Sequence, residues 1–162
     1  MVSLDTPIAH VNGVLNAVVA EGDLVGQTVF EGAGAGERPT ASAVVADLVD
    51  IAADRSAPPF AVPVAGLKAR PVQSMDVRRG EYYVRLMVHD RPGVLAEVAR
   101  IFAGAEVSIE SVLQRGRAPG SIVPLILTTH DTEEAAMSRV RKQLASLPNS
   151  AEEPSLIRIE AF

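Results

Sequence analysis

The stretch from His89 to Ala96, HDRPGVLA, combines residue types that favour an anion-binding turn at the start of a helix. Pro92 fixes φ at a helix entrance, and Gly93 allows a backbone or a ligand to come close. The N–H groups at a helix start favour a carboxylate, so the turn suits the carboxylate of a free amino acid. His89, beside the turn, is a candidate ligand contact. The alternative interpretation is that Asp90 merely caps the helix, because such caps are common.

A second candidate is the glycine-rich segment Gly32-Ala33-Gly34-Ala35-Gly36. A segment of this kind before a helix can cradle a phosphate group. It lacks the G-x-G-x-x-G spacing of dinucleotide-binding turns and the Gly-Lys-Ser/Thr of a P-loop. A plain turn between a strand and a helix is the alternative interpretation.

Other chemistry finds little support in the sequence. There is no Cys, and His10, His89 and His130 are scattered, so we expect no metal site. Ser108 and Ser111 have no partner His in a context that indicates a catalytic triad. We therefore predict neither a catalytic residue nor a metal ligand in this chain.

The composition excludes several classes of partner. The net charge of -5 argues against a nucleic-acid-binding surface, which would need a basic face. The apolar runs are too short to span a membrane, and the N-terminus lacks the pattern of a signal peptide. We expect a cytoplasmic protein with neither a nucleic-acid nor a membrane partner.

The elements that would position the His89–Ala96 turn form a strand and helix pattern in residues 81–162. Their order is βαββαβ with short connections, which is typical of a ferredoxin-like sheet with four antiparallel strands and both helices on one face. Asp131 or Thr132 is the expected cap of the last helix. The predicted strands and helices are Tyr82–Val88, helix Gly93–Ala103, Val107–Arg115, Ile122–Thr129, helix Thr132–Leu147 and Ser155–Glu160.

Residues 1–56 predict a hairpin followed by one helix, so the fold class is α+β. The strands are Val11–Ala20 and Leu24–Glu31, joined by a turn in which Gly22 is suited to a positive φ. The helix is Ala41–Ala53. Pro39 stands at its entrance, where a first-turn proline is tolerated, and Thr40 or Ser42 are candidates to satisfy its free N–H groups. A piece of this size buries too little surface to be stable alone. We therefore expect apolar faces that another domain would cover.

Residues 57–80 are rich in Pro, Gly and basic residues and predict a semi-extended linker. We expect Lys68, Arg70, Arg78 and Arg79 to be solvated, as charge runs usually are.

The second half of the chain resembles ACT domains. Residues 90–95, DRPGVL, match the D-x-P-G-x-L signature of these domains, and residues 107–112, VSIESV, resemble their second strand. The resemblance implies a homodimer paired through its sheets and an amino acid bound near the first loop. The residues that it implies around the ligand are Asp90, Arg91, Pro92, Gly93, Val94 and Leu95, with Ser108, Ile109 and Glu110 nearby, contributed by a partner subunit.

The first half resembles the end of the catalytic domain of homoserine dehydrogenases. The resemblance rests on residues 11–17 (VNGVLNA), 21–22 (EG), 32–36 (GAGAG) and 39–47 (PTASAVVAD), and Ala33 stands where the family often has Pro. It implies that Gly32–Gly36 lies near the nicotinamide of NAD(P) in the full enzyme. The family's nucleotide-binding domain and catalytic Lys have no counterpart here, since the only lysines are Lys68 and Lys142. We expect a C-terminal piece of a longer enzyme, without a cofactor of its own and unable to transfer hydride by itself.

The leading functional hypothesis is feedback control of homoserine dehydrogenase, which interconverts aspartate semialdehyde and homoserine with NAD(P). The ACT domain would sense an amino acid, and threonine is the effector that the family suggests. Two alternatives remain: a dimerisation module that binds no ligand, and a stand-alone amino-acid-binding regulator that acts in trans.

Overall fold

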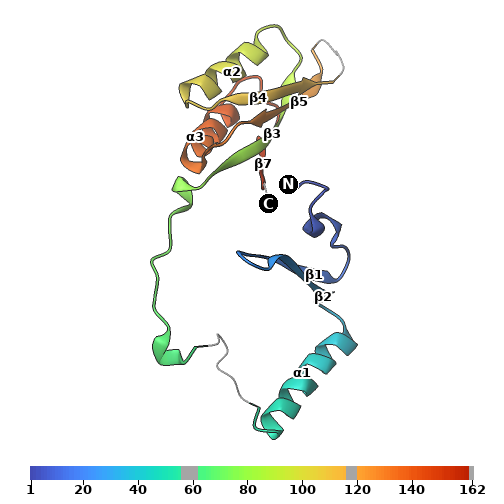
Figure 1. Ribbon diagram of the computed structural model, residues 1–162. Helices are drawn as coiled ribbons and strands as arrows, with labels where there is room; N and C mark the ends of the chain where they lie inside the picture. The colour runs from blue at the N-terminus through green and yellow to red at the C-terminus, as the bar shows by residue number, and fades with distance from the viewer. Residues whose placement is uncertain (56–61, 116–119, 161–162) are drawn as a thin grey trace. The chain divides into compact units, whose positions relative to one another are not determined.

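The computed structural model describes residues 1–55, 62–115 and 120–160 (Figure 1). The chain divides into two compact units. Unit 1 comprises Met1 and Val72–Phe162, and unit 2 comprises Val2–Pro71. Within the described residues, no helix is long and apolar enough to cross a membrane.

Unit 1 contains an antiparallel sheet whose central strand is β3 (Arg79–His89). One side of β3 pairs with β5 (Ile122–Thr129), which pairs in turn with β4 (Ile109–Gln114). The other side pairs with β7 (Ser155–Ile159) and, at its first two residues, with the short β6 (Thr132–Glu133). The spatial order β4-β5-β3-β7 confirms the predicted ferredoxin-like arrangement.

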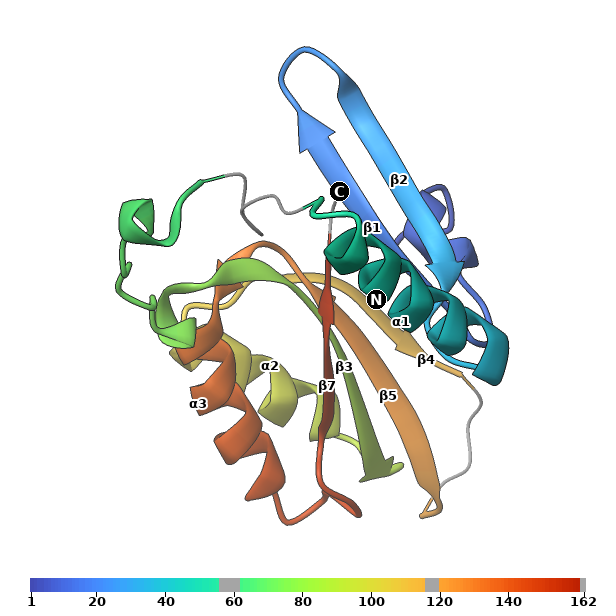
Figure 2. The same cartoon turned by 90° about the horizontal axis from the view of Figure 1, so that it is seen from below.

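Two helices, α2 (Val94–Gly104) and α3 (Glu134–Ala145), cover one face of this sheet (Figure 2). Strands β3 and β5 alternate buried and more exposed residues, as expected for a sheet with one covered face. Val98 and Phe102 of α2 and Val140 and Leu144 of α3 are fully buried. The strand residues of this core are Tyr82, Val84, Leu86, Val88, Val123, Leu125 and Leu127.

The start of the last helix differs from the prediction. Residues Thr132 and Glu133 pair with β3, so α3 begins only at Glu134. Neither Asp131 nor Thr132 caps it: the N-cap residue is Glu133, without a side-chain hydrogen bond. The carboxylate of Asp131 accepts instead from Arg79 Nε at 2.7 Å, because β6 brings these residues together.

The expectation of solvated charges is wrong for Arg78, whereas Arg79, the first residue of β3, forms an ion pair but keeps a side chain that is 56% exposed. Arg78 pairs with Glu160 at 2.6 Å, and Arg79 pairs with Asp131 at 2.7 Å. The side chain of Arg78 is only 22% exposed. Upstream, the described part of the predicted linker contains two short 3-10 turns, Val64–Gly66 and Met75–Val77.

Unit 2 contains a short 3-10 turn (Pro7–His10), a hairpin and a helix. Strand β1 (Leu15–Gly22) pairs with β2 (Gly26–Ala33), and α1 (Glu37–Ala52) follows. None of the residues of α1 is buried, which confirms the expected exposed apolar face. The apolar side chains exposed on α1 are Val44, Val45, Leu48, Val49 and Ile51.

The predicted hairpin is displaced along the sequence. The two strands meet with Gly22 opposite Gly26, and the left-handed residue is Gly26, with φ of +70°, rather than Gly22. Helix α1 also begins four residues before the predicted start, and neither Thr40 nor Ser42 caps it. The N-cap residue is Gly36, whose φ of +121° favours glycine, and the Thr40 hydroxyl donates back to the carbonyl of Gly36 at 2.7 Å.

Candidate ligand-binding site

The turn between β3 and α2 is held by the backbone of the neighbouring strand connection. The N–H of Asp90 donates to the carbonyl of Ser121 at 2.8 Å, and the carbonyl of Asp90 accepts from the N–H of Gly120 at 3.1 Å. The Asp90 carboxylate accepts from Gln114 Nε2 at 3.4 Å. The alternative interpretation that Asp90 caps the helix is wrong, because the N-cap residue of α2 is Gly93 and no side chain caps this position.

Gly93 is required by the conformation of the chain at this point. Its φ of +94° lies in the left-handed region, which side chains with a Cβ rarely adopt. A Cβ at this position would meet nothing within 4 Å, so space above the backbone remains for a ligand. The first N–H groups of a helix carry a partial positive charge that favours an anion, and the N–H of Val94 makes only a long hydrogen bond, 3.4 Å, to the carbonyl of Arg91.

A small cavity of about 210 Å³ lies over this turn. It is smaller than the pockets that hold drug-sized ligands, which suits a small metabolite. His89 lines it, as the sequence suggested, and Gln114 of β4 and Leu125 of β5 form its far wall. All six residues predicted from the signature also line it: Asp90, Arg91, Pro92, Gly93, Val94 and Leu95.

Gln114 is the polar cavity residue that the sequence did not reveal. It becomes visible only when β4 and β5 pair antiparallel, because that register places Gln114 opposite Leu125, close to the end of β3. The predicted strand order implies that β4 and β5 are neighbours, but it does not determine the register that places Gln114 opposite Leu125.

Ser108, Ile109 and Glu110 lie at the other end of β4, and none of them lines this cavity. The carbonyl of Ser108 accepts from the N–H of His130 at 3.0 Å, and Glu110 accepts from the Thr128 hydroxyl at 3.1 Å. A single chain does not bring these residues to the turn. Their contact with a ligand stays a prediction that requires a second subunit.

Arg91 belongs to the cavity wall but also reaches the helical side of the unit. Its Nη2 donates to the side-chain oxygen of Asn149, whose amide nitrogen donates to Glu97 Oε2 at 3.2 Å. These residues line a wider, more open groove of about 620 Å³ between α2 and α3, together with Arg100 and others. The guanidinium of Arg91 therefore connects the turn to α2 and to the loop after α3.

The glycine-rich segment of unit 2 has structural reasons for its glycines. A Cβ on Gly34 would lie 1.6 Å from Asn16 Nδ2, and the N–H of Gly34 donates to the carbonyl of Val14 at 2.8 Å. Gly32 and Ala33 end β2, and Gly36 is the left-handed N-cap of α1. The observed contacts match a strand-to-helix turn, and contact of Gly32–Gly36 with a nicotinamide stays a prediction.

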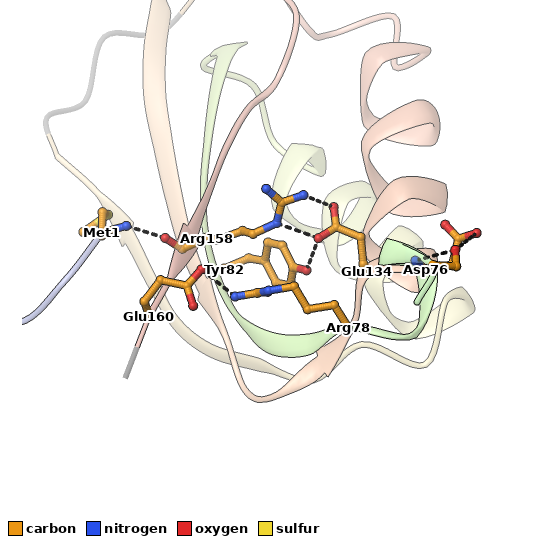
Figure 3. A network of polar contacts seen from close by, with 8 residues as sticks. Met1, Asp76, Arg78, Tyr82, Glu134, Arg158 and Glu160 are labelled. Atoms are coloured by element: carbon orange, nitrogen blue, oxygen red, sulfur yellow. Dashed lines mark hydrogen bonds and ion pairs between the residues drawn. The ribbon is translucent and has the colours of Figure 1, made fainter. Parts of the chain in front are cut away.

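A second polar centre in unit 1 surrounds Tyr82 (Figure 3). The Tyr82 hydroxyl donates to Glu134 Oε2 at 2.8 Å. Arg158 donates to both oxygens of the same carboxylate, from Nε at 2.7 Å and from Nη2 at 2.8 Å. Arg78 Nη1 is buried without a hydrogen-bond partner among the described residues, and it lies over Gly80, where a Cβ would be 2.9 Å away.

The contacts of this centre shift the pKa values of its members. The hydrogen bonds from Arg158 hold the pKa of Glu134 below its usual value. Burial, followed by the hydrogen bond to Glu134, raises the pKa of Tyr82. The hydrogen bond to Glu160 raises the pKa of Arg78. Glu134 and Arg78 therefore stay charged near neutral pH, and Tyr82 stays neutral. The contacts of this centre link β3, β7 and α3.

No group of three or more His, Cys, Asp or Glu side chains suited to a metal ion occurs among the residues that the structure covers.

The fold and the turn define unit 1 as an ACT domain. Residues 82–149 match the family model of the ACT domain, and residues 1–49 match the model described as homoserine dehydrogenase. The chain thus corresponds to the C-terminal region of homoserine dehydrogenases, with the ACT domain after a segment of the dehydrogenase family.

Individual relatives agree with both family matches. The chain is 38% identical to homoserine dehydrogenase of Pseudomonas aeruginosa and 40% identical to that of Mycobacterium bovis, over 99% of its own length in each case. It spans 38% and 37% of those relatives. A crystal structure of homoserine dehydrogenase from Thiobacillus denitrificans matches 98% of this chain and 37% of that one, with a TM-score of 0.78 and 39% identity.

Proposed function

We propose that the ACT domain binds a free amino acid, with threonine as the leading candidate, in the cavity over the β3–α2 turn. The observation that carries this proposal is the cavity of about 210 Å³, which is lined by the outward-facing start of α2. The carboxylate of the amino acid would accept from the N–H of Leu95 and would compete with the carbonyl of Arg91, 3.4 Å away, for the N–H of Val94. Gln114 would supply an amide to the polar groups of the ligand.

The binding would regulate homoserine dehydrogenase activity by feedback. Threonine would bind one arrangement of the paired ACT domains better than another, and this difference in binding free energy would bias the catalytic part. The chain spans only 38% of the Pseudomonas aeruginosa enzyme. The catalytic reaction, its NAD(P) cofactor and a cytoplasmic location are therefore proposed for a full-length protein that contains this chain. The cofactor would be held by the nucleotide-binding domain of a full-length enzyme, which would also cover the apolar face of α1.

Isothermal titration of the 162-residue chain with L-threonine tests the proposal. We expect measurable heat with L-threonine and much less with D-threonine. A matched pair of variants assigns the site, because Gln114 lines the cavity over the turn, whereas Gln143 lines the open groove between α2 and α3. Gln114→Ala should weaken binding several-fold, and Gln143→Ala should leave it unchanged.

The absence of heat and of any thermal shift at millimolar threonine would count against the proposal. Weakening by Gln143→Ala alone would move the site to the groove. Homoserine and isoleucine belong in the same experiment, because each also presents a free carboxylate to the turn.

A second candidate function is dimerisation without a ligand. The face of the sheet opposite the helices exposes apolar side chains: Leu113 is 43% exposed, Ile122 50% and Ile157 42%. The edge strand β4 leaves backbone groups available for pairing with a second sheet. Analytical ultracentrifugation with and without threonine separates the two functions, because a purely structural dimer would form equally well in both.

A further inference from the structure

One end of β7 contacts both segments of the chain that flank unit 2. The N-terminal nitrogen of Met1 donates to the carbonyl of Arg158 (Figure 3). The N–H of Glu160 donates to the carbonyl of Met1 at 2.8 Å. The side chain of Glu160 accepts from Arg78 Nη2 at 2.6 Å. Met1 directly precedes unit 2 in the sequence, and Arg78 lies a few residues after it. Arg158 of β7 and Glu160, just after the strand, thus hold the chain on both sides of unit 2.

Arg78 makes further contacts besides its ion pair with Glu160. Its carbonyl accepts from the N–H of Glu134 at 2.8 Å, at the first residue of α3. Its guanidinium lies over Gly80, where the missing side chain provides the space. The segment that enters the sheet is therefore fastened at once to α3 and to the end of β7.

The loop that leads into β7, from residue 149 onward, contacts the ligand turn. The carbonyl of Asn149 accepts from the N–H of His89 at 3.1 Å, and its side chain accepts from Arg91. The N–H of Ala151 donates to the carbonyl of Met87 at 2.7 Å. Asn149 also donates to Glu97 of α2 at 3.2 Å. The loop that leads into β7 is thus bonded to the strand, the turn and the helix that form the cavity.

We propose that residues 149–160, named here the β7 strap, form a mechanical link between the ligand turn and the two segments that flank unit 2. A shift of Arg91 on ligand binding would displace Asn149, and the strap would deliver this displacement to Glu160, Arg78 and Met1. The link itself is a property of this chain, and only its regulatory meaning rests on the proposed amino-acid binding. A physical coupling of this kind requires that perturbing one end changes the stability of the other.

Hydrogen exchange measured by mass spectrometry on the full chain, without any ligand, tests the link. Asn149→Ala removes the side-chain contacts with Arg91 and Glu97 at the turn, and Glu160→Gln removes the charge that pairs with Arg78 at the other end. Glu153→Gln is the matched control, because Glu153 lies on the strap but pairs outward with Arg141 on α3 at 2.5 Å. If Asn149→Ala loosens the fold as a whole, Arg91→Gln removes the same contact from an exposed position.

We expect each releasing variant to speed exchange roughly threefold at its own end, as for the loss of a partly exposed polar contact. The decisive result lies at the far end. Asn149→Ala should also speed exchange in residues 75–80, and Glu160→Gln in residues 89–95, beyond any change in the control. Faster exchange confined to the mutated end in both variants would overturn the proposal. Because no ligand is present, this outcome is independent of the threonine titration.

Discussion

The replacement Glu134→Gln tests the polar centre around Tyr82 most sharply. The carboxylate of Glu134 is 17% exposed and accepts one hydrogen bond from Tyr82 and two from Arg158. A Gln side chain has the same shape but presents an amide donor to the guanidinium, so at least one bond to Arg158 is lost and the others lose their charge. The backbone N–H of residue 134 still donates to the carbonyl of Arg78 in this variant, so only the side-chain contacts change.

The expected loss of stability follows from the exposure of the partners. Hydrogen bonds to charged groups contribute about 1.5–3 kcal/mol when they are protected from water. Arg158 is 44% exposed, so screening by solvent reduces the total for this replacement to about 1–2 kcal/mol. For a domain of this size the melting temperature should fall by about 5–10 °C. The control Glu153→Gln breaks a pair whose carboxylate is 70% exposed and should cost about 0.5 kcal/mol or less.

The pH dependence provides an independent check on the same replacement. The pKa of Glu134 is lower in the folded protein than in the unfolded chain, so the folded state holds its proton more weakly. The stabilisation is therefore complete above the unfolded pKa and is lost as the pH falls through the folded pKa. Thermal melts followed by circular dichroism across this range should show the gap between wild type and Glu134→Gln closing in acid. A gap no larger than that of Glu153→Gln, or one that persists unchanged below the folded pKa, would refute the reasoning.

Three further replacements have defined outcomes. Gly93→Ala should destabilise unit 1 by about 1–2 kcal/mol because of its φ of +94°, whereas Gly104→Ala, with open space around it, should not destabilise the unit in the same melts. Gly34→Ala, where a Cβ would overlap a neighbouring amide side chain, should speed hydrogen exchange in the hairpin, and Gly32→Ala, with nothing within 4 Å, should do so much less. Tyr82→Phe should remove part of the alkaline instability: the raised pKa of Tyr82 means that wild type loses stability as the pH rises above about 10.

The sequence predicted the elements of unit 1 well wherever burial is periodic. The bounds of β5 agree with the predicted strand, because Val123, Leu125 and Leu127 alternate with more exposed residues. The start of α2 was within one residue of the prediction, since Gly93 marks it. The signature from Asp90 to Leu95 contains six of the ten residues that line the cavity over the turn, because adjacent residues of one turn stay together in any fold.

The remaining features depend on contacts between residues that are distant in the sequence. Arg78 and Glu160 are 82 positions apart and meet only when β3 and β7 pair. Gln114 reaches the cavity through a strand register that the pattern of apolar residues does not determine. The hairpin of unit 2 was displaced because two glycines, Gly22 and Gly26, could each have held the positive φ, and their exposed surroundings gave no burial pattern to decide between them.

The central claim is that the turn at the start of α2 receives an amino acid. Amide signals in two-dimensional nuclear magnetic resonance spectra of the chain, recorded while L-threonine is added, test it most directly. The account predicts that the signals of Gly93, Val94 and Leu95 shift together and saturate at one threonine concentration. Spectra that do not change, or shifts confined to Arg100 and Gln143 in the groove between the helices, would contradict it.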